Sequence, residues 1–113
     1  GRELGFPTAN LVAPRDRAVP SDGVYAGWLE PSGGLDAGRR LPSAISVGTN
    51  PTFEGVEQRV ETYVIGRDDL ELYGVDVTVT FAEWLRGQIK FDGIEPLISQ
   101  MSDDVEAAKR ALS

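Results

Sequence analysis

Short alternations of apolar and polar residues fill most of the chain before Gly93. The clearest alternation covers residues 75–81, where every second residue is apolar and Asp76, Thr78 and Thr80 lie between them. A period of two is typical of a strand with one buried face in an antiparallel sheet. Other segments share this character, so we expect strands at residues 23–29, 41–47, 59–65 and 75–81.

Segments rich in glycine and proline separate these predicted strands. Turn-forming residues gather at residues 20–23, 31–34 and 50–55, and we expect a loop at each place. Several short strands joined by such turns favour a β-barrel or β-sandwich over an α/β fold.

The C-terminal residues follow a helical period instead of an alternation. Apolar residues recur at helical spacing at Ile94, Leu97, Ile98, Met101, Val105, Ala108 and Leu112. Asp92, with Glu95 three residues later, predicts a capped helix start. The polar residues 102–104 predict a division into two helices, with Asp103 capping the second. We expect the shared apolar stripe to pack on the outside of the sheet.

Composition fits one domain over residues 1–113 with a modest core. The chain begins with Gly1, and we expect it to be an N-terminally truncated fragment of a longer protein. Its residues contain no run of about 18 apolar positions and no recognisable signal peptide. We therefore expect no membrane partner and a cytoplasmic location.

Charge and missing residue types narrow the chemistry further. The formal net charge is −7, with no basic stripe, which argues against nucleic acid as a partner. The sequence contains no cysteine and no histidine, so thiolate nucleophiles, imidazole bases and sulfur- or imidazole-ligated metals are excluded from these residues. An enzyme with this composition must use carboxylates, hydroxyls, amides, cationic side chains and a hard metal.

The opening segment, residues 5–10, is a first candidate site. It reads Gly-Phe-Pro-Thr-Ala-Asn, and its plain interpretation is a turn in which Thr8 and Asn10 bond nearby backbone. Its functional interpretation is a magnesium site, because hydroxyl and carbonyl oxygens suit this ion when phosphates complete its shell.

Glu61 is a second candidate. On a strand, Glu61 and Tyr63 point to the face opposite Val60, Thr62 and Val64. A glutamate at such a position is usually solvated surface. It is also the residue type that accepts a proton from an attacking alcohol.

Residues 85–92 form a third candidate segment, in which basic and aromatic residues mix between the last strand and the helix. The plain interpretation is a solvated connector with Phe91 anchored on the core. The functional interpretation is a flap over a bound ring, because loops on rigid scaffolds often carry binding residues.

Taken in order, motifs along the whole chain resemble the riboflavin kinase family, including the C-terminal half of bacterial bifunctional FAD synthetases. They are Gly5-Phe-Pro-Thr-Ala-Asn10, Gly23-Val-Tyr25, Ser46-Val-Gly-Thr-Asn-Pro-Thr-Phe53, Val60-Glu61, Leu72-Tyr-Gly74, Leu85-Arg86, Phe91-Asp92 and Leu97-Ile-x-x-Met101 with Asp104 and Ala107 beyond. The resemblance implies a closed six-stranded antiparallel Greek-key barrel with a C-terminal helix, whose first strand precedes Gly1.

The resemblance also implies an activity and its residues. ATP would donate its terminal phosphoryl group to the ribityl 5′-hydroxyl of riboflavin, giving FMN and ADP with Mg²⁺ as cofactor. Thr8 would ligate the magnesium, and Gly5, Thr8 and Asn10 would bind the ATP phosphates. Glu61 would be the general base, and Arg86 and Phe91 would bind the flavin. An FMN adenylyltransferase domain is expected N-terminal to this module in the full-length protein.

Two other functions stay open at this point. The chain could be a non-catalytic barrel that binds flavin or nucleotide, although the presence of Thr8, Asn10 and Glu61 speaks against this. It could also be an interaction domain with an oligosaccharide- or oligonucleotide-binding barrel, which the acidic charge disfavours.

Overall fold

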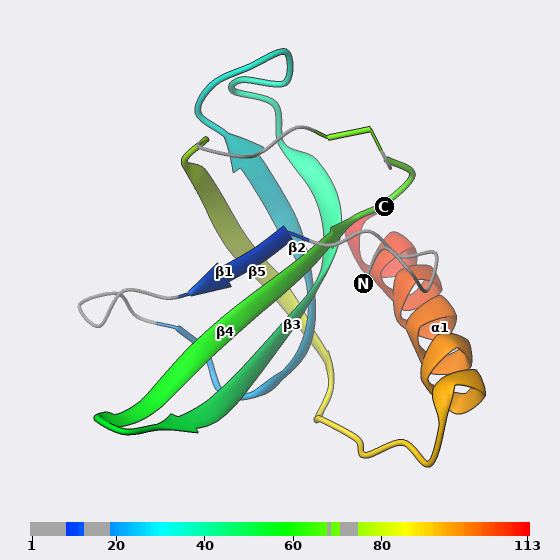
Figure 1. Ribbon diagram of the computed structural model, residues 1–113. Helices are drawn as coiled ribbons and strands as arrows, with labels where there is room; N and C mark the ends of the chain where they lie inside the picture. Colours follow the sequence, from blue (N-terminus) through cyan, green and yellow to red (C-terminus); the bar gives the residue numbers. More distant parts are fainter. Residues whose placement is uncertain (1–8, 13–18, 68, 71–74) are drawn as a thin grey trace.

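The computed structural model describes residues 9–12, 19–67, 69–70 and 75–113, which form one antiparallel sheet and one long helix (Figure 1). The sheet order is β1-β4-β3-β2-β5, and every neighbouring pair is antiparallel. The elements are β1 (Ala9–Val12), β2 (Gly23–Pro31), β3 (Leu41–Thr52), β4 (Gly55–Val64), β5 (Val77–Arg86) and α1 (Ile94–Leu112).

Alternation along β3 and β4 separates an inner from an outer face of the sheet, as the sequence predicts. Ile45 and Val47 are buried on the inner face, together with Val60 of β4. Glu61 and Tyr63 lie between buried neighbours and are only half-buried, so they belong to the outer face. The β-period of the sequence therefore places Glu61 outside the core.

The sheet is curved, because side chains from non-adjacent strands meet on its inner face. Val79 of β5 packs against a cluster that includes Val64 of β4, although β3 and β2 lie between these strands. Register shifts between β2 and β5 occur after Val24 and Ala26. Such irregularities strengthen the local twist and bend the sheet.

The expected closed, six-stranded barrel is not what the described residues form. They supply five strands, with β1 and β5 at the edges of the sheet, and these two strands are not paired with each other. Closure would require a further ladder between these edges, and no described segment provides one.

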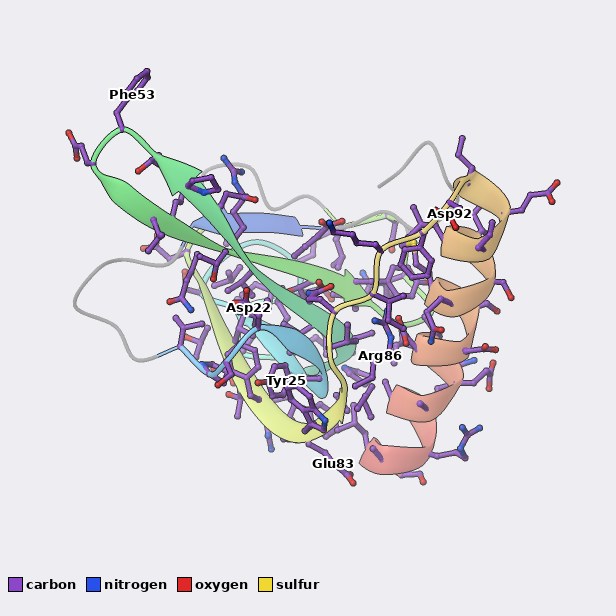
Figure 2. The ribbon with its side chains drawn as sticks, turned by 90° about the horizontal axis from the view of Figure 1, so that it is seen from below. Asp22, Tyr25, Phe53, Glu83, Arg86 and Asp92 are labelled. Carbon is purple, nitrogen blue, oxygen red and sulfur yellow. The ribbon has the colours of Figure 1, made fainter. Side chains whose placement is uncertain are left out.

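The β3–β4 connection is tighter than the loop expected at residues 50–55. The ladder continues through Asn50–Glu57 to Thr52–Gly55, so only Phe53 and Glu54 remain between the strands. Gly55 has a φ of 134°, which a residue with a side chain adopts only under strain. Phe53 projects from the tip of this hairpin and is fully exposed (Figure 2).

The C-terminal segment is one helix, so the predicted division at residues 102–104 is wrong. It continues because Asp104 turns inward to a partner on β5, and the apolar stripe runs on to buried Ala108. The predicted cap is also wrong: Gly93 precedes the helix, without a side-chain cap hydrogen bond.

The helix packs on the outer face of the sheet, against β2, β3 and β5, as expected. Among the described residues no backbone hydrogen bond joins α1 to the sheet, so side chains alone hold it there. The described segments include no helix with the length and apolar character needed to cross a membrane.

Candidate functional site

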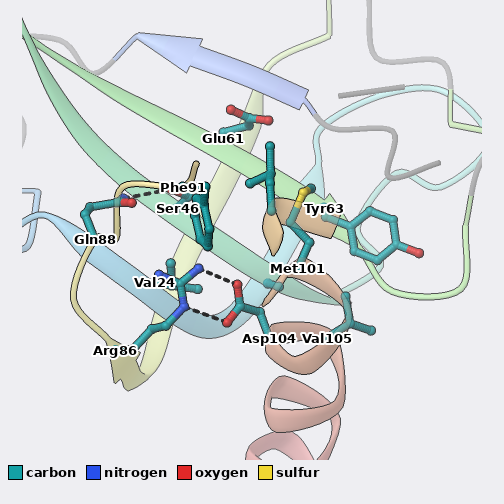
Figure 3. Close-up of a pocket in the computed structure, with 12 residues that line it drawn as sticks. Val24, Ser46, Glu61, Tyr63, Arg86, Gln88, Phe91, Met101, Asp104 and Val105 are labelled. Carbon is teal, nitrogen blue, oxygen red and sulfur yellow. Dashed lines mark hydrogen bonds and ion pairs between the residues drawn. The ribbon is translucent and has the colours of Figure 1, made fainter. Parts of the chain in front are cut away.

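A pocket of about 150 Å³ lies between the outer face of the sheet and α1 (Figure 3). Strands β2, β3 and β4 form one wall, the helix forms the opposite wall, and the connector from β5 to α1 covers one side. The lining residues are Val24, Ala44, Ser46, Glu61, Tyr63, Arg86, Gln88, Phe91, Leu97, Met101, Asp104 and Val105.

The alternation along the strands and the helical spacing along α1 explain which side chains reach the pocket. Ala44 and Ser46 are the outward positions of β3, and their small size leaves room beside the strand. On the helix, Leu97, Met101 and Val105 recur every four residues, so they share one face. The result is a mainly apolar space with a carboxylate at its edge.

Glu61 lies at one end of this space, and Arg86 and Asp104 lie at the other end (Figure 3). Between them, the apolar walls suit a flat ring system, because ligand pockets combine apolar lining with a few placed polar groups. A carboxylate beside such a cavity can accept a proton from a hydroxyl held against it.

The connector between β5 and α1 is fastened over the pocket by Gln88. Its Nε2 donates to Ser46 Oγ at 2.9 Å and to the Val47 carbonyl oxygen at 2.8 Å. Phe91, three residues later, then contributes its half-buried side chain to the lining. This segment therefore lies beside the pocket, and its role as a flap over a bound ring stays a prediction.

Arg86 and Asp104 form a bidentate ion pair at the end of the pocket opposite Glu61. Arg86 Nε donates to Asp104 Oδ1 at 2.8 Å, and Nη2 donates to Oδ2 at 2.7 Å. Gln100 Nε2 also donates to Oδ1 at 3.1 Å, and Arg86 Nη1 donates to the Gly87 carbonyl oxygen at 2.9 Å. Both charged side chains are largely covered, with 18% and 10% of their surfaces exposed.

Three of the predicted site residues, Glu61, Arg86 and Phe91, line this one pocket although they come from distant segments. Asn10 lies on β1, and its backbone is in register opposite Glu61. Gly5 and Thr8 fall outside the described residues, so the predicted phosphate and metal roles stay predictions.

Sequence reasoning missed Asp104 as a site residue. A signal exists: Asp104 falls three residues after Met101 and four before Ala108, so a charged side chain occupies the apolar face. A charge at a buried position implies a partner of opposite sign. The position of that partner depends on how the helix docks, and the sequence pattern does not give it.

The described residues contain no group of three or more acidic, histidine or cysteine side chains that could hold a metal by themselves. Glu61 and Ser46 supply oxygen atoms beside the pocket. This donor set is compatible with Mg²⁺ only as part of a shell that phosphate oxygens and waters complete.

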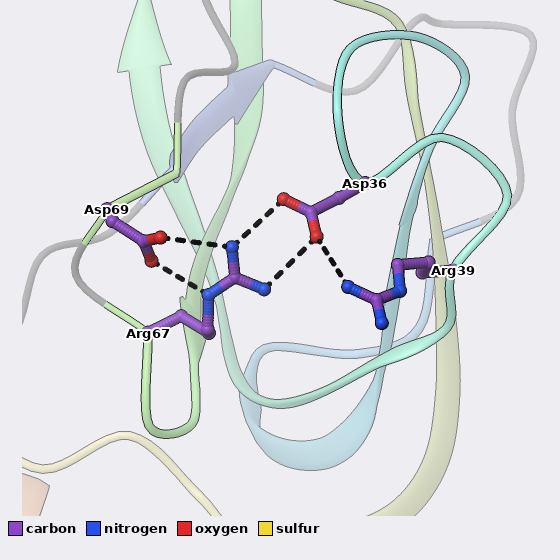
Figure 4. Close-up of polar contacts among 4 residues, drawn as sticks. All are labelled: Asp36, Arg39, Arg67 and Asp69. Atoms are coloured by element: carbon purple, nitrogen blue, oxygen red, sulfur yellow. Dashed lines mark hydrogen bonds and ion pairs between the residues drawn. The ribbon is translucent and has the colours of Figure 1, made fainter.

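A second charged cluster joins the β2–β3 turn to the segment after β4, and none of its residues lines the pocket (Figure 4). Arg67 donates from Nη1 and Nη2 to Asp36 at 3.1 and 3.0 Å, and from Nε to Asp69 at 2.7 Å. Arg39 also donates to Asp36, at 3.2 Å.

The hydrogen bonds from Arg67 lower the pKa of both Asp36 and Asp69 below the ordinary value of 3.8. The same bonds raise the pKa of Arg67, and the bond that Asp69 accepts has a larger effect than those that Asp36 accepts. The cluster therefore stays ionised in neutral solution and links two loops.

Comparison with known proteins identifies the family. The riboflavin kinase family model, described as Flavokinase, matches residues 1–112. Riboflavin kinase of Mus musculus is 33% identical over 114 residues, which cover 98% of this chain and 71% of the relative. The bifunctional riboflavin kinase/FMN adenylyltransferase of Escherichia coli K12 is 33% identical over 110 residues, covering 96% of this chain and 33% of that protein.

A solved structure is also similar. A crystal structure described as a macrolide-efflux protein from Streptococcus pneumoniae superposes with a TM-score of 0.84 at 34% identity, covering 96% of this chain and 34% of that one. This match supports the observed fold, while the family model and the named relatives give the assignment. The chain belongs to the riboflavin kinase family.

Proposed function

We propose that this chain transfers the terminal phosphoryl group of ATP to the ribityl 5′-hydroxyl of riboflavin, giving FMN and ADP. Membership of the riboflavin kinase family supports riboflavin phosphorylation. The observation that carries the residue-level proposal is the position of Glu61, which lines the pocket on a strand whose register sets it opposite Asn10.

Glu61 is the proposed general base. As the 5′-oxygen bonds to the γ-phosphorus, the bond from that phosphorus to the β,γ-bridging oxygen breaks, and ADP leaves with the bond electrons. The hydroxyl proton passes to the Glu61 carboxylate. Phosphoryl transfer of this type depends mainly on alignment and charge stabilisation, so the protein needs no group for covalent catalysis and a single oriented carboxylate can serve as the base.

Asn10, Thr8 and Gly5 are the proposed phosphate-binding residues, with Thr8 as the protein ligand of Mg²⁺. Residues opposite each other in an antiparallel ladder belong to the same face of the sheet, so the register supports a common site for Asn10 and Glu61. When bound, magnesium neutralises charge on the ATP phosphates.

Phe91 and Arg86 are the proposed flavin contacts, because both line the apolar pocket that ends at Glu61. In this arrangement the ring lies between the sheet and α1, and the ribityl chain extends toward β4. Apolar side chains of the helix would cover the ring from the other side.

The proposal extends to the whole protein in two respects. A sixth strand would close the sheet between β5 and β1, the edges of the described sheet. This chain spans about a third of the bifunctional relatives, for example 33% of the Escherichia coli protein. An FMN adenylyltransferase domain in the full-length protein is therefore part of the proposal.

The test is FMN formation from riboflavin, ATP and Mg²⁺, followed by chromatography of the flavins. Glu61→Gln removes the base but keeps the side-chain size, so kcat should fall about 10²- to 10⁴-fold. The ATP KM should change little. Glu83→Gln is the matched control, because Glu83 is exposed on β5 and does not line the pocket.

Two outcomes would contradict parts of this proposal. If the wild-type protein binds riboflavin but forms no FMN, it is a flavin-binding barrel without kinase activity. If Glu61→Gln reduces kcat and ATP affinity by equal factors, Glu61 is a ligand-binding residue and not the base.

A further inference from the structure

The ion pair between Arg86 and Asp104 joins the end of β5 to the helix that forms one wall of the pocket. Arg86 is the last residue of β5, and Asp104 lies in the middle of α1. Two hydrogen bonds of 2.7 and 2.8 Å join the guanidinium to the two oxygens of the carboxylate. A bidentate pair fixes direction as well as distance, which a single charge contact does not.

Asp104 is set up for this contact by its own helix. Gln100, one turn earlier, donates to Oδ1 at 3.1 Å and so orients the carboxylate. The neighbouring residues on this face, Met101 and Val105, line the pocket. The direction of the Asp104 side chain therefore determines how this face of the helix is presented to the sheet.

Arg86 also contacts the connector between β5 and α1. Its Nη1 donates to the carbonyl oxygen of Gly87, the first residue after the strand. Gln88 then fastens the chain to β3, and Phe91 enters the lining three residues later. One guanidinium thus holds the helix, the strand end and the start of the covering segment together.

We propose that Asp104 is a positioning residue for riboflavin: through Arg86 it sets the width of the pocket and the placement of Phe91. This inference rests on the proposed function only for the identity of the ligand. Asp104 makes no phosphate contact in this scheme, so its loss should affect the flavin and leave ATP binding unchanged.

Asp104→Asn tests the inference with little change in size. The amide offers one acceptor oxygen in place of two and places N–H groups opposite a donor, so the bidentate geometry is lost. The riboflavin KM should rise about tenfold, the low end of the effect known for removing a partner that orients a metal-ligating residue. The ATP KM should stay within about twofold, well inside that tenfold scale.

Asp103→Asn is the matched control, because it is the same substitution one residue earlier at an exposed position. Riboflavin affinity, measured by flavin fluorescence quenching, gives a second readout that needs no catalysis. Circular dichroism of each variant reports whether the fold is intact. A merely structural pair would lower the melting temperature without changing riboflavin affinity per folded molecule.

Gln100→Ala keeps the inference testable if Asp104→Asn does not fold. It leaves both charges and removes only the hydrogen bond that orients the carboxylate. Riboflavin affinity should then fall about two- to threefold, because only the part of this charge-assisted hydrogen bond that orients the carboxylate is transmitted to the flavin. An unchanged affinity in every folded variant would overturn the inference.

Failure of the inference and failure of the proposed function give different results. If wild-type protein makes FMN and Asp104→Asn matches Asp103→Asn in riboflavin KM and affinity, only the positioning role is wrong. If wild-type protein binds riboflavin without making FMN, the kinase proposal is wrong, while reduced affinity in Asp104→Asn still supports the role of Asp104. If riboflavin does not bind at all, both are wrong.

Discussion

The inner and outer faces of the sheet use the same strands for different purposes. On β3 and β4 the inner face presents Ile45, Val47 and Val60, all buried. The outer face of these strands presents small residues and Glu61 to a pocket, and α1 covers it only through side chains. One residue of offset along a strand separates a core position from a site position.

This difference separates stability from chemistry in the molecule. Inner-face side chains gain free energy by leaving water, and their loss should weaken the fold. Outer-face side chains are half-buried around a space that a ligand can fill, so their loss should mainly change binding. Substitutions on each face, and in the charged cluster that belongs to neither face, can test this division.

The largest effect on stability is expected from Ile45→Ala on the inner face. Ile45 is fully buried, so removing its side chain should lower the free energy of unfolding by about 2–5 kcal/mol. Urea denaturation measures this change. The fraction of protein that remains folded should keep its riboflavin KM. Leu35→Ala, at a fully exposed residue, should change the free energy by less than about 0.5 kcal/mol.

Phe91→Ala should destabilise the fold less than Ile45→Ala and change riboflavin binding more. The side chain lines the pocket, and loss of an aromatic contact worth about 1.4 kcal/mol raises the riboflavin KM about tenfold. Steady-state kinetics with varied riboflavin concentration measures this KM. Phe53→Ala is the control, because it makes the same change at the exposed hairpin tip. Equal KM values for the two variants would show that Phe91 does not contact the flavin.

The smallest effect is expected from Arg67→Gln in the second charged cluster, and it depends on pH. The pKa values of Asp36 and Asp69 are lowered in the folded protein from their ordinary value of 3.8. Their ionised forms therefore stabilise the folded state fully when the pH is above that ordinary value. This contribution is lost as the pH falls through the lowered pKa values.

Urea midpoints at neutral pH and below pH 3 test that expectation. Arg67→Gln should lower the midpoint at neutral pH, and the difference from wild type should shrink in acid. Arg59→Gln, at the more exposed pair with Glu57, is the control and should change little at either pH. A difference that stays constant with pH would show that Arg67 acts by packing and not by charge.

Much of the fold could be predicted from the sequence because it depends on local periods. The alternation over residues 59–65 gives both the strand and the outward position of Glu61, and β4 confirms it. The apolar spacing after Gly93 gives the helix. These features are visible in single segments because one face of each element must be buried.

Features that depend on contacts between distant segments could not be predicted. The break expected at residues 102–104 is absent because Asp104 meets Arg86, a residue 18 positions earlier. The curvature of the sheet brings Val79 against the cluster that contains Val64, and no local pattern contains such a contact. The grouping of Glu61, Arg86 and Phe91 needed the resemblance to a family, and the structure gives their common pocket its shape.

The docking of α1 by side chains alone has a consequence for exchange with solvent. Since the helix shares no backbone hydrogen bond with the described sheet, it can lift away while every ladder of β2, β3 and β4 stays closed. Such partial opening needs less free energy than global unfolding. Amide protection in these strands should therefore be unaffected when the helix opens.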